Sequence, residues 1–334
     1  MHVGKAYRTS EFILWSRRKI FVLLAMSTWP ILLYVTVGFK GFSVPWSVVL
    51  LLGTTVALVT GFKNTQTYNR SVEAQLIWAS ITTSSRVWGG LCRDFLSAEE
   101  ARKLIYRHVA WLTALRFALR APRAWETSTQ KANVEYERRY CVPEKVASLH
   151  DEIGWCAAPT EIEPALAAAN PATRLLYVQG ASLKGLLDSG ALSIQAYLEM
   201  LKVLRELHDQ QSRSERIKNF PYPRQYAVIS ALFVTIFCTL LPFGMISQFE
   251  AMNGLVDGFM KGSMVWLAIP FSVVIGWMYT SLDQVGESTS NPFEGGANDV
   301  PISQISRMIE IELREALGET ELPAPLLPVN GIAM

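Results

Sequence analysis

Long stretches without charged side chains alternate with polar stretches along this chain. Four such runs, each of about 20 residues or more, cover residues 20–39, 41–62, 226–249 and 262–282. A helix of about 20 residues crosses roughly 30 Å of hydrocarbon. A single run would also suit a buried helix of a soluble protein, but four in one chain predict four membrane-spanning helices.

Charged residues next to these runs predict how the helices are oriented. Basic residues are concentrated before the first run, where they are Lys5, Arg8, Arg17, Arg18 and Lys19. Lys40 alone is charged between the first two runs. Because cytoplasmic flanks carry the excess of Lys and Arg, the N-terminus is predicted to lie in the cytosol. Four crossings return the C-terminus to the same side.

The region between the second and third runs has a helical composition. Ala, Leu, Glu and Arg dominate it, and the alternation typical of strands is scarce. Ser97 followed by Glu100 predicts a helix start, the step from Ala121 to Pro122 its end, and residues 188–190 a turn. The sequence therefore predicts an all-α membrane protein with a cytosolic N-terminal segment (1–19), two spans (20–62), a cytosolic helical region (63–225), two further spans (226–282) and a cytosolic C-terminal segment (283–334).

Charge and the reactive residue types exclude several functions. The net charge of +2 is too small to indicate the basic surface that binds a nucleic-acid partner. No Asp, Glu, Lys, Arg or His lies inside the four runs, whereas a proton-coupled transporter usually keeps such a group there. The four histidines and four cysteines have no metal-ligand or CxxC spacing, so we expect buried, reduced thiols and no metal, cofactor or catalytic centre. The functions that these observations leave open are passive permeation through the membrane and a structural role.

Three motifs carry a resemblance to a known family. The second run ends in Gly-Phe-Lys-Asn (61–64), followed by Tyr68-x-Arg70, Glu73-Ala74 and Trp78. The third run contains Cys-Thr-Leu-Leu-Pro-Phe (238–243), and the fourth is followed by Asn-Pro-Phe (291–293) and Ala-Asn-Asp-Val-Pro (297–301). In this order the motifs resemble those of bacterial bestrophin homologues over nearly the whole chain.

The resemblance implies a homopentameric ion channel with one central pore, embedded in membrane lipid and conducting small monovalent ions. Most members of the family conduct anions such as chloride, and some bacterial members resemble cation channels. Animal members are opened by calcium that an acidic run holds after Asn-Pro-Phe. Here this run contains only Glu294 and Asp299, separated by Gly-Gly-Ala-Asn, which is poor for an ion that takes six to eight oxygens.

The resemblance places a narrow neck on the second span. Thr54, Leu58 and Phe62 follow one another at i, i+4 and i+8 and share a helix face. In a symmetric ring each would form one layer of side chains, and stacked apolar rings gate by dewetting. The alternative is a stripe that faces lipid or packs on a neighbouring helix. Thr54 replaces a bulky aliphatic residue of related sequences, so a wetter outer neck is expected.

A second constriction at the cytosolic exit is placed by the same resemblance at Gln195, with Ile194 as the alternative if the alignment slips by one residue. Three basic residues would favour anions if they faced the lumen: Lys63, Lys184 and Arg174.

Asp299 is expected to cap a helix that begins near Pro301. That helix carries an apolar stripe expected to pack on its own domain: Ile302, Ile305, Ile309, Leu313 and Leu317.

Two functions from other classes compete with the channel. A membrane-anchored scaffold or sensor would use the spans only as an anchor and bind a partner through the cytosolic helices. An integral membrane enzyme is disfavoured because no His, Cys or carboxylate cluster is present. The sequence therefore favours a channel, with anion conduction expected and cation selectivity as the open alternative.

Overall fold

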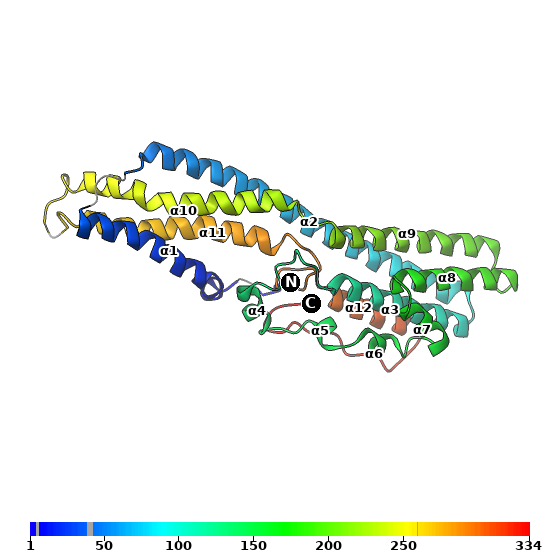
Figure 1. Cartoon of the computed structure of the whole chain (residues 1–334). Helices are drawn as coiled ribbons and strands as arrows, with labels where there is room; N and C mark the ends of the chain where they lie inside the picture. The colour runs from blue at the N-terminus through cyan, green and yellow to red at the C-terminus, as the bar shows by residue number, and fades with distance from the viewer. Residues whose placement is uncertain (5–6, 39–42, 259) are drawn as a thin grey trace. The chain divides into compact units, whose positions relative to one another are not determined.

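The computed structural model describes residues 1–4, 7–38, 43–258 and 260–334, and within these ranges its regular elements are all helices (Figure 1). This confirms the predicted all-α class. The elements are α1 (Thr9–Val37), α2 (Trp46–Phe95), α3 (Ala98–Arg120), α4 (Lys131–Glu137), α5 (Pro143–Val146), α6 (Leu149–Ile153), α7 (Pro159–Leu166), α8 (Pro171–Asp188), α9 (Ile194–Asn219), α10 (Arg224–Met252), the 3₁₀ helix η1 (Met264–Leu267), α11 (Ala268–Ser288) and α12 (Ile302–Ala316).

The chain divides into two compact units, and α2 contributes to both. The membrane unit comprises residues 6–69 and 222–290. The α3 unit comprises residues 1–5, 70–221 and 291–334. Both units combine segments that lie far apart in the sequence.

Four helices are long and apolar enough to cross a membrane: α1, α2, α10 and the segment Met264–Ser288. These four candidate spans coincide with the four apolar runs of the sequence. All four are longer than the apolar runs, most clearly α1, which begins at Thr9, and α2, which continues to Phe95. No proline interrupts residues 46–95, so the polar residues after Phe62 prolong the same helix. Lys5 and Lys40, used above for orientation, lie outside the described residues.

Close approach of backbones holds the membrane unit together. A Cβ atom on Gly276 of α11 would lie 2.8 Å from a methyl carbon of Leu23 on α1. One on Gly244 of α10 would lie 2.7 Å from Val49 on α2. Helices in lipid gain from such contacts between small residues, because tight packing replaces the hydrophobic effect there.

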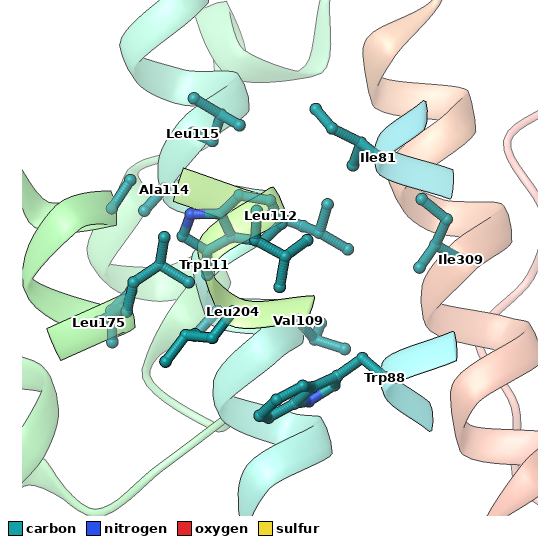
Figure 2. Close-up of a cluster of buried hydrophobic side chains, with 14 of the residues drawn as sticks. Ile81, Trp88, Val109, Trp111, Leu112, Ala114, Leu115, Leu175, Leu204 and Ile309 are labelled. Atoms are coloured by element: carbon teal, nitrogen blue, oxygen red, sulfur yellow. The ribbon is translucent and has the colours of Figure 1, made fainter. Parts of the chain in front are cut away.

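Helix α3 is the buried centre of its unit. Figure 2 shows Trp111, Leu112 and Leu115 of α3 surrounded by side chains of α2, α8, α9 and α12, among them Leu175, Leu204 and Ile309. The α12 stripe thus packs on its own unit, as expected.

Ser97 caps α3 through the backbone N–H of Glu100, and α3 ends at Arg120, which confirms both predicted boundaries. The prediction of buried cysteines is wrong for Cys141, which is exposed.

His108 is a neutral histidine in this core. Its Nε2 lies 2.8 Å from the Ser85 hydroxyl, which itself donates to the carbonyl of Ile81. The hydroxyl proton is therefore used, so Nε2 carries the hydrogen and donates it. The ring lies between Trp88 and Trp111. Burial lowers the pKa of His108 to about 3, because an imidazolium there would lose its water.

We predict that the α3 unit loses stability as the pH falls below 6.5. The unfolded chain takes up the His108 proton near pH 6.5, whereas the folded chain resists it down to its lowered pKa. Each pH unit in this interval should therefore cost about 1.4 kcal/mol. Thermal melting of parent and His108→Phe protein at pH 7 and pH 5 tests this. The Phe variant should lose part of the acid sensitivity; an identical shift in both proteins contradicts the prediction.

Candidate pore-lining site and motif loop

Helix α2 has one exposed and one buried face within the membrane unit. Thr54, Leu58 and Phe62 lie on the exposed face, and the Leu58 and Phe62 residues are 75% and 56% exposed. The buried face carries Val49, Gly53, Val56, Thr60 and Lys63. At 100° per residue, the exposed positions centre on Leu58 and the buried positions lie opposite. The three predicted neck residues therefore share the face of α2 that its own unit leaves uncovered.

The Thr54 hydroxyl is turned toward its own helix. Its Oγ1 lies 2.7 Å from the carbonyl oxygen of Leu50 and 3.0 Å from that of Leu51. A threonine in a helix commonly donates to the carbonyl one turn earlier. The hydroxyl proton is therefore engaged, and only the oxygen lone pairs of Thr54 remain for a permeating ion or water.

Lys63 does not supply a free charge beside Phe62. Its Nζ lies 2.7 Å from Oδ1 of Asp283 on α11, and its side chain is only 4% exposed. The condition under which Lys63 is expected to favour anions, that its side chain face the lumen, is therefore not met within this unit. The side chain lies on the buried face of α2, where its charge is neutralised. Lys184 is likewise paired with Asp188, on an exposed surface.

Gln195 and Ile194 both lie in the first turn of α9 and both are exposed. Ser193 caps this helix by accepting from the Ala196 N–H. Gln195 lines an open groove together with Phe95, Leu198 and Arg205. The guanidinium of Arg205 has no carboxylate within ion-pair distance among the described residues. The assignment of the cytosolic constriction to Gln195 stays a prediction.

The loop after the fourth span is organised by Asp299. Its carboxylate accepts hydrogen bonds from the backbone N–H groups of Phe293 (2.8 Å), Gly295 (2.8 Å) and Val300 (2.7 Å). Arg120 of α3 pairs with it at 2.7 Å. Helix α12 begins at Ile302, and no side chain caps it. The predicted cap by Asp299 is therefore wrong, because Asp299 lies three residues before the helix and its oxygens are used within the loop.

The Asn-Pro-Phe motif is explained by this loop. Phe293 has a positive φ of 75°, which is unfavourable for a bulky residue, and its side chain is fully buried 6.5 Å from the ring of Trp78. The bond from its N–H to Asp299 holds the backbone in this conformation. The motifs after the second and fourth spans thus meet in one packed contact.

Arg70, from the Tyr-x-Arg motif, also has a structural role in the α3 unit. Its guanidinium donates to the carbonyl oxygens of Ile217 (3.0 Å) and Phe220 (2.9 Å). These carbonyls lie at the C-terminal end of α9, where no further helical N–H is available. A positive charge is also favourable at this end of the helix dipole.

Glu294 and Asp299 do not fit a calcium site. Both oxygens of Glu294 accept from Thr127, through its N–H (2.9 Å) and its hydroxyl (2.7 Å). Burial raises the pKa of Glu294 to about 7, so part of the population is neutral at physiological pH. Arg120 supplies a fixed positive charge beside Asp299. A calcium ion would have to displace these donors and approach a guanidinium.

The described residues form helices, four of them long and apolar enough to span a membrane, which is the architecture of a helical multi-span membrane protein. A model of the family described as "Bacterial/Fungal Bestrophin protein" matches residues 10–315. The chain belongs to the bestrophin family. This confirms the resemblance shown by the three motifs and, with it, the prediction that the chain is not an enzyme.

Named relatives and solved structures agree with this assignment. The chain is 27% identical to the voltage-dependent anion channel-forming protein YneE of Escherichia coli O157:H7, covering 88% of this chain and 83% of the relative. A voltage-dependent anion channel-forming protein of Mesorhizobium japonicum is 24% identical, covering 84% and 77%. The fold is similar to that of a bacterial bestrophin homologue from Klebsiella pneumoniae, with a TM-score of 0.76 and 24% identity over 91% of this chain and 99% of that one.

We predict that micromolar calcium does not open channels formed by this chain. The donors around Glu294 and Asp299 already satisfy the carboxylate oxygens that calcium would need. Currents in planar bilayers, recorded first in chelator and then after calcium is added, test this. Currents that vanish in chelator and return with calcium contradict the prediction.

We also predict that Arg120→Met strongly destabilises the α3 unit. The substitution leaves Asp299 buried without its partner, and loss of one member of a buried ion pair costs about 3–5 kcal/mol. Arg123→Met is the matched control, because within the described part of the chain the Arg123 guanidinium donates to the side-chain oxygen of Asn219 at the surface, and its loss should cost about 0.5 kcal/mol or less. Melting temperatures of the two variants measure the difference, and similar values would show that Asp299 does not depend on Arg120.

Proposed function

We propose that this chain forms a homopentameric channel of the bacterial inner membrane. Five copies surround a single pore that conducts small monovalent anions, such as chloride, down their gradient. The exposed face of α2, with Leu58 and Phe62 at its centre, is the observation that carries the proposal. Family membership and the names of the relatives support anion conduction.

The neck follows from placing the exposed face of α2 toward the symmetry axis. Thr54, Leu58 and Phe62 then form three successive rings, with the threonine ring outermost. An ion that passes the apolar rings loses water and gains no protein partner, which makes these rings the main barrier. A polar ring of Gln195 then forms the cytosolic exit, since an amide both donates and accepts hydrogen bonds.

The proposed topology places residues 1–19, 63–225 and 283–334 in the cytosol, with spans within 20–62 and 226–282. A reporter fused after residue 334 tests this arrangement. We expect a cytosolic reporter to be active there. Activity of a reporter that works only in the periplasm contradicts the topology.

Purified protein in planar bilayers tests the function. Under a gradient of potassium chloride, we expect unitary currents whose reversal potential lies near the chloride equilibrium potential. A reversal potential near that of potassium would instead show a cation channel. A stable oligomer that passes no current would favour a membrane-anchored scaffold.

We predict that Leu58→Ala and Phe62→Ala raise conductance or open probability by about twofold or more, because wider apolar rings stay hydrated. Assembly should survive, since neither side chain is covered within its unit. Leu232→Ala on α10 and Phe21→Ala on α1 are matched controls, with exposed apolar residues expected to face lipid. Single-channel recording and size-exclusion chromatography measure both properties. Neck variants that assemble and conduct like the parent contradict the neck assignment.

A further inference from the structure

We propose that the buried pair of Lys63 and Asp283 positions the neck helix, and that its balanced charges keep either partner from biasing the ion selectivity. The inference rests on the proposed neck at Leu58 and Phe62. The pair lies on the buried face of α2, one residue after Phe62, and joins α2 to α11. It is a charged contact in a unit that buries a cluster of apolar side chains and several hydroxyl groups.

The contact is built from several groups. Ser230 of α10 donates to the same Asp283 oxygen at 3.0 Å, so three helices meet at this carboxylate. The Asn64 amide donates to the carbonyl of Leu282 at 3.1 Å. A Cβ atom on Gly286 would lie 1.9 Å from the Asn64 side-chain oxygen, so a larger residue there would displace the Asn64 amide from this position.

These contacts fix the rotation of α2 about its axis. Successive residues on a helix are 100° apart, so a Lys63 side chain held against α11 turns Leu58 to the opposite face. A few degrees of rotation would move the Phe62 ring, which is next in the chain. Lys63 and Asp283 are therefore positioning residues, and we do not assign them direct contact with the permeating ion.

The pair also neutralises two charges close to the narrowest part of the pore. Charges interact over long distances where water is scarce, because the effective dielectric constant is low. With both partners present, an ion in the neck meets little net field from this site. Removal of one partner leaves a fixed charge of known sign one residue from the Phe62 ring.

Single neutral variants should therefore change selectivity in opposite directions. Lys63→Met leaves the negative charge of Asp283 and should raise cation permeability relative to chloride. Asp283→Asn leaves the positive charge of Lys63 and should raise chloride permeability. We expect a change of about twofold or more in the permeability ratio for each, given the strength of uncompensated charges at short range. Lys63→Met with Asp283→Asn together should return the ratio toward the parent value.

The reversal potential in asymmetric potassium chloride is the measurement, with chromatography to verify assembly. Lys184→Met and Asp188→Asn are matched controls, because that pair is exposed and should leave the ratio unchanged. If neither single variant assembles, the exchanged pair, Lys63→Asp with Asp283→Lys, decides. Assembly with parent selectivity supports the pair, and failure of the exchanged protein overturns it.

Two results overturn the inference directly. The first is that assembled Lys63→Met and Asp283→Asn channels have the parent reversal potential. The second is that both variants shift it in the same direction, which a general loss of structure would produce. The parent channel is recorded in the same bilayers. A silent parent refutes the proposed function, whereas a conducting parent with unaffected variants refutes only the role of the pair.

Discussion

The ion pair between Lys63 and Asp283 determines which way the second helix faces. A lysine whose side chain is almost fully buried needs a partner, because an unpaired charge away from water is costly. Asp283 on α11 is that partner, and Ser230 on α10 supports it. Once Lys63 is directed toward α11, the helical repeat directs Leu58 to the open side. The small residues Gly53, Gly244 and Gly276 then let the other helices pack closely around the same core.

In the α3 unit, too, buried charged side chains are paired with residues of opposite charge. Arg120 is buried at the end of a helix most of whose residues are buried, and it pairs with Asp299, which lies in a loop 179 residues away in sequence. Lys218 and Glu126 form a second pair that is nearly inaccessible to water. Such pairs contribute specificity more than stability, since their desolvation offsets most of their attraction. The Arg120–Asp299 pair belongs to the loop in which Phe293 lies against Trp78.

The loop after the fourth span shows how a motif can keep its shape while its chemistry changes. Its backbone amides converge on Asp299, an arrangement that a bound cation could also stabilise through the same carboxylate. Here the Arg120 guanidinium pairs with Asp299, and the backbone N–H and hydroxyl of Thr127 donate to the two oxygens of Glu294. The motif therefore indicates how the loop is folded, whereas the neighbouring side chains determine which ligands the loop can bind.

The sequence by itself determined the number of spans, the helical class, the ends of α3 and the family, because uncharged runs, capping residues and short motifs are local properties of the chain. The candidate neck could also be named from helical spacing once the family was recognised. Only the tertiary structure decided the partners of Lys63 and Asp299, which lie 220 and 179 residues away in the chain. Neither spacing nor composition encodes such pairings, because they arise when helices pack and each buried charge must find an opposite one.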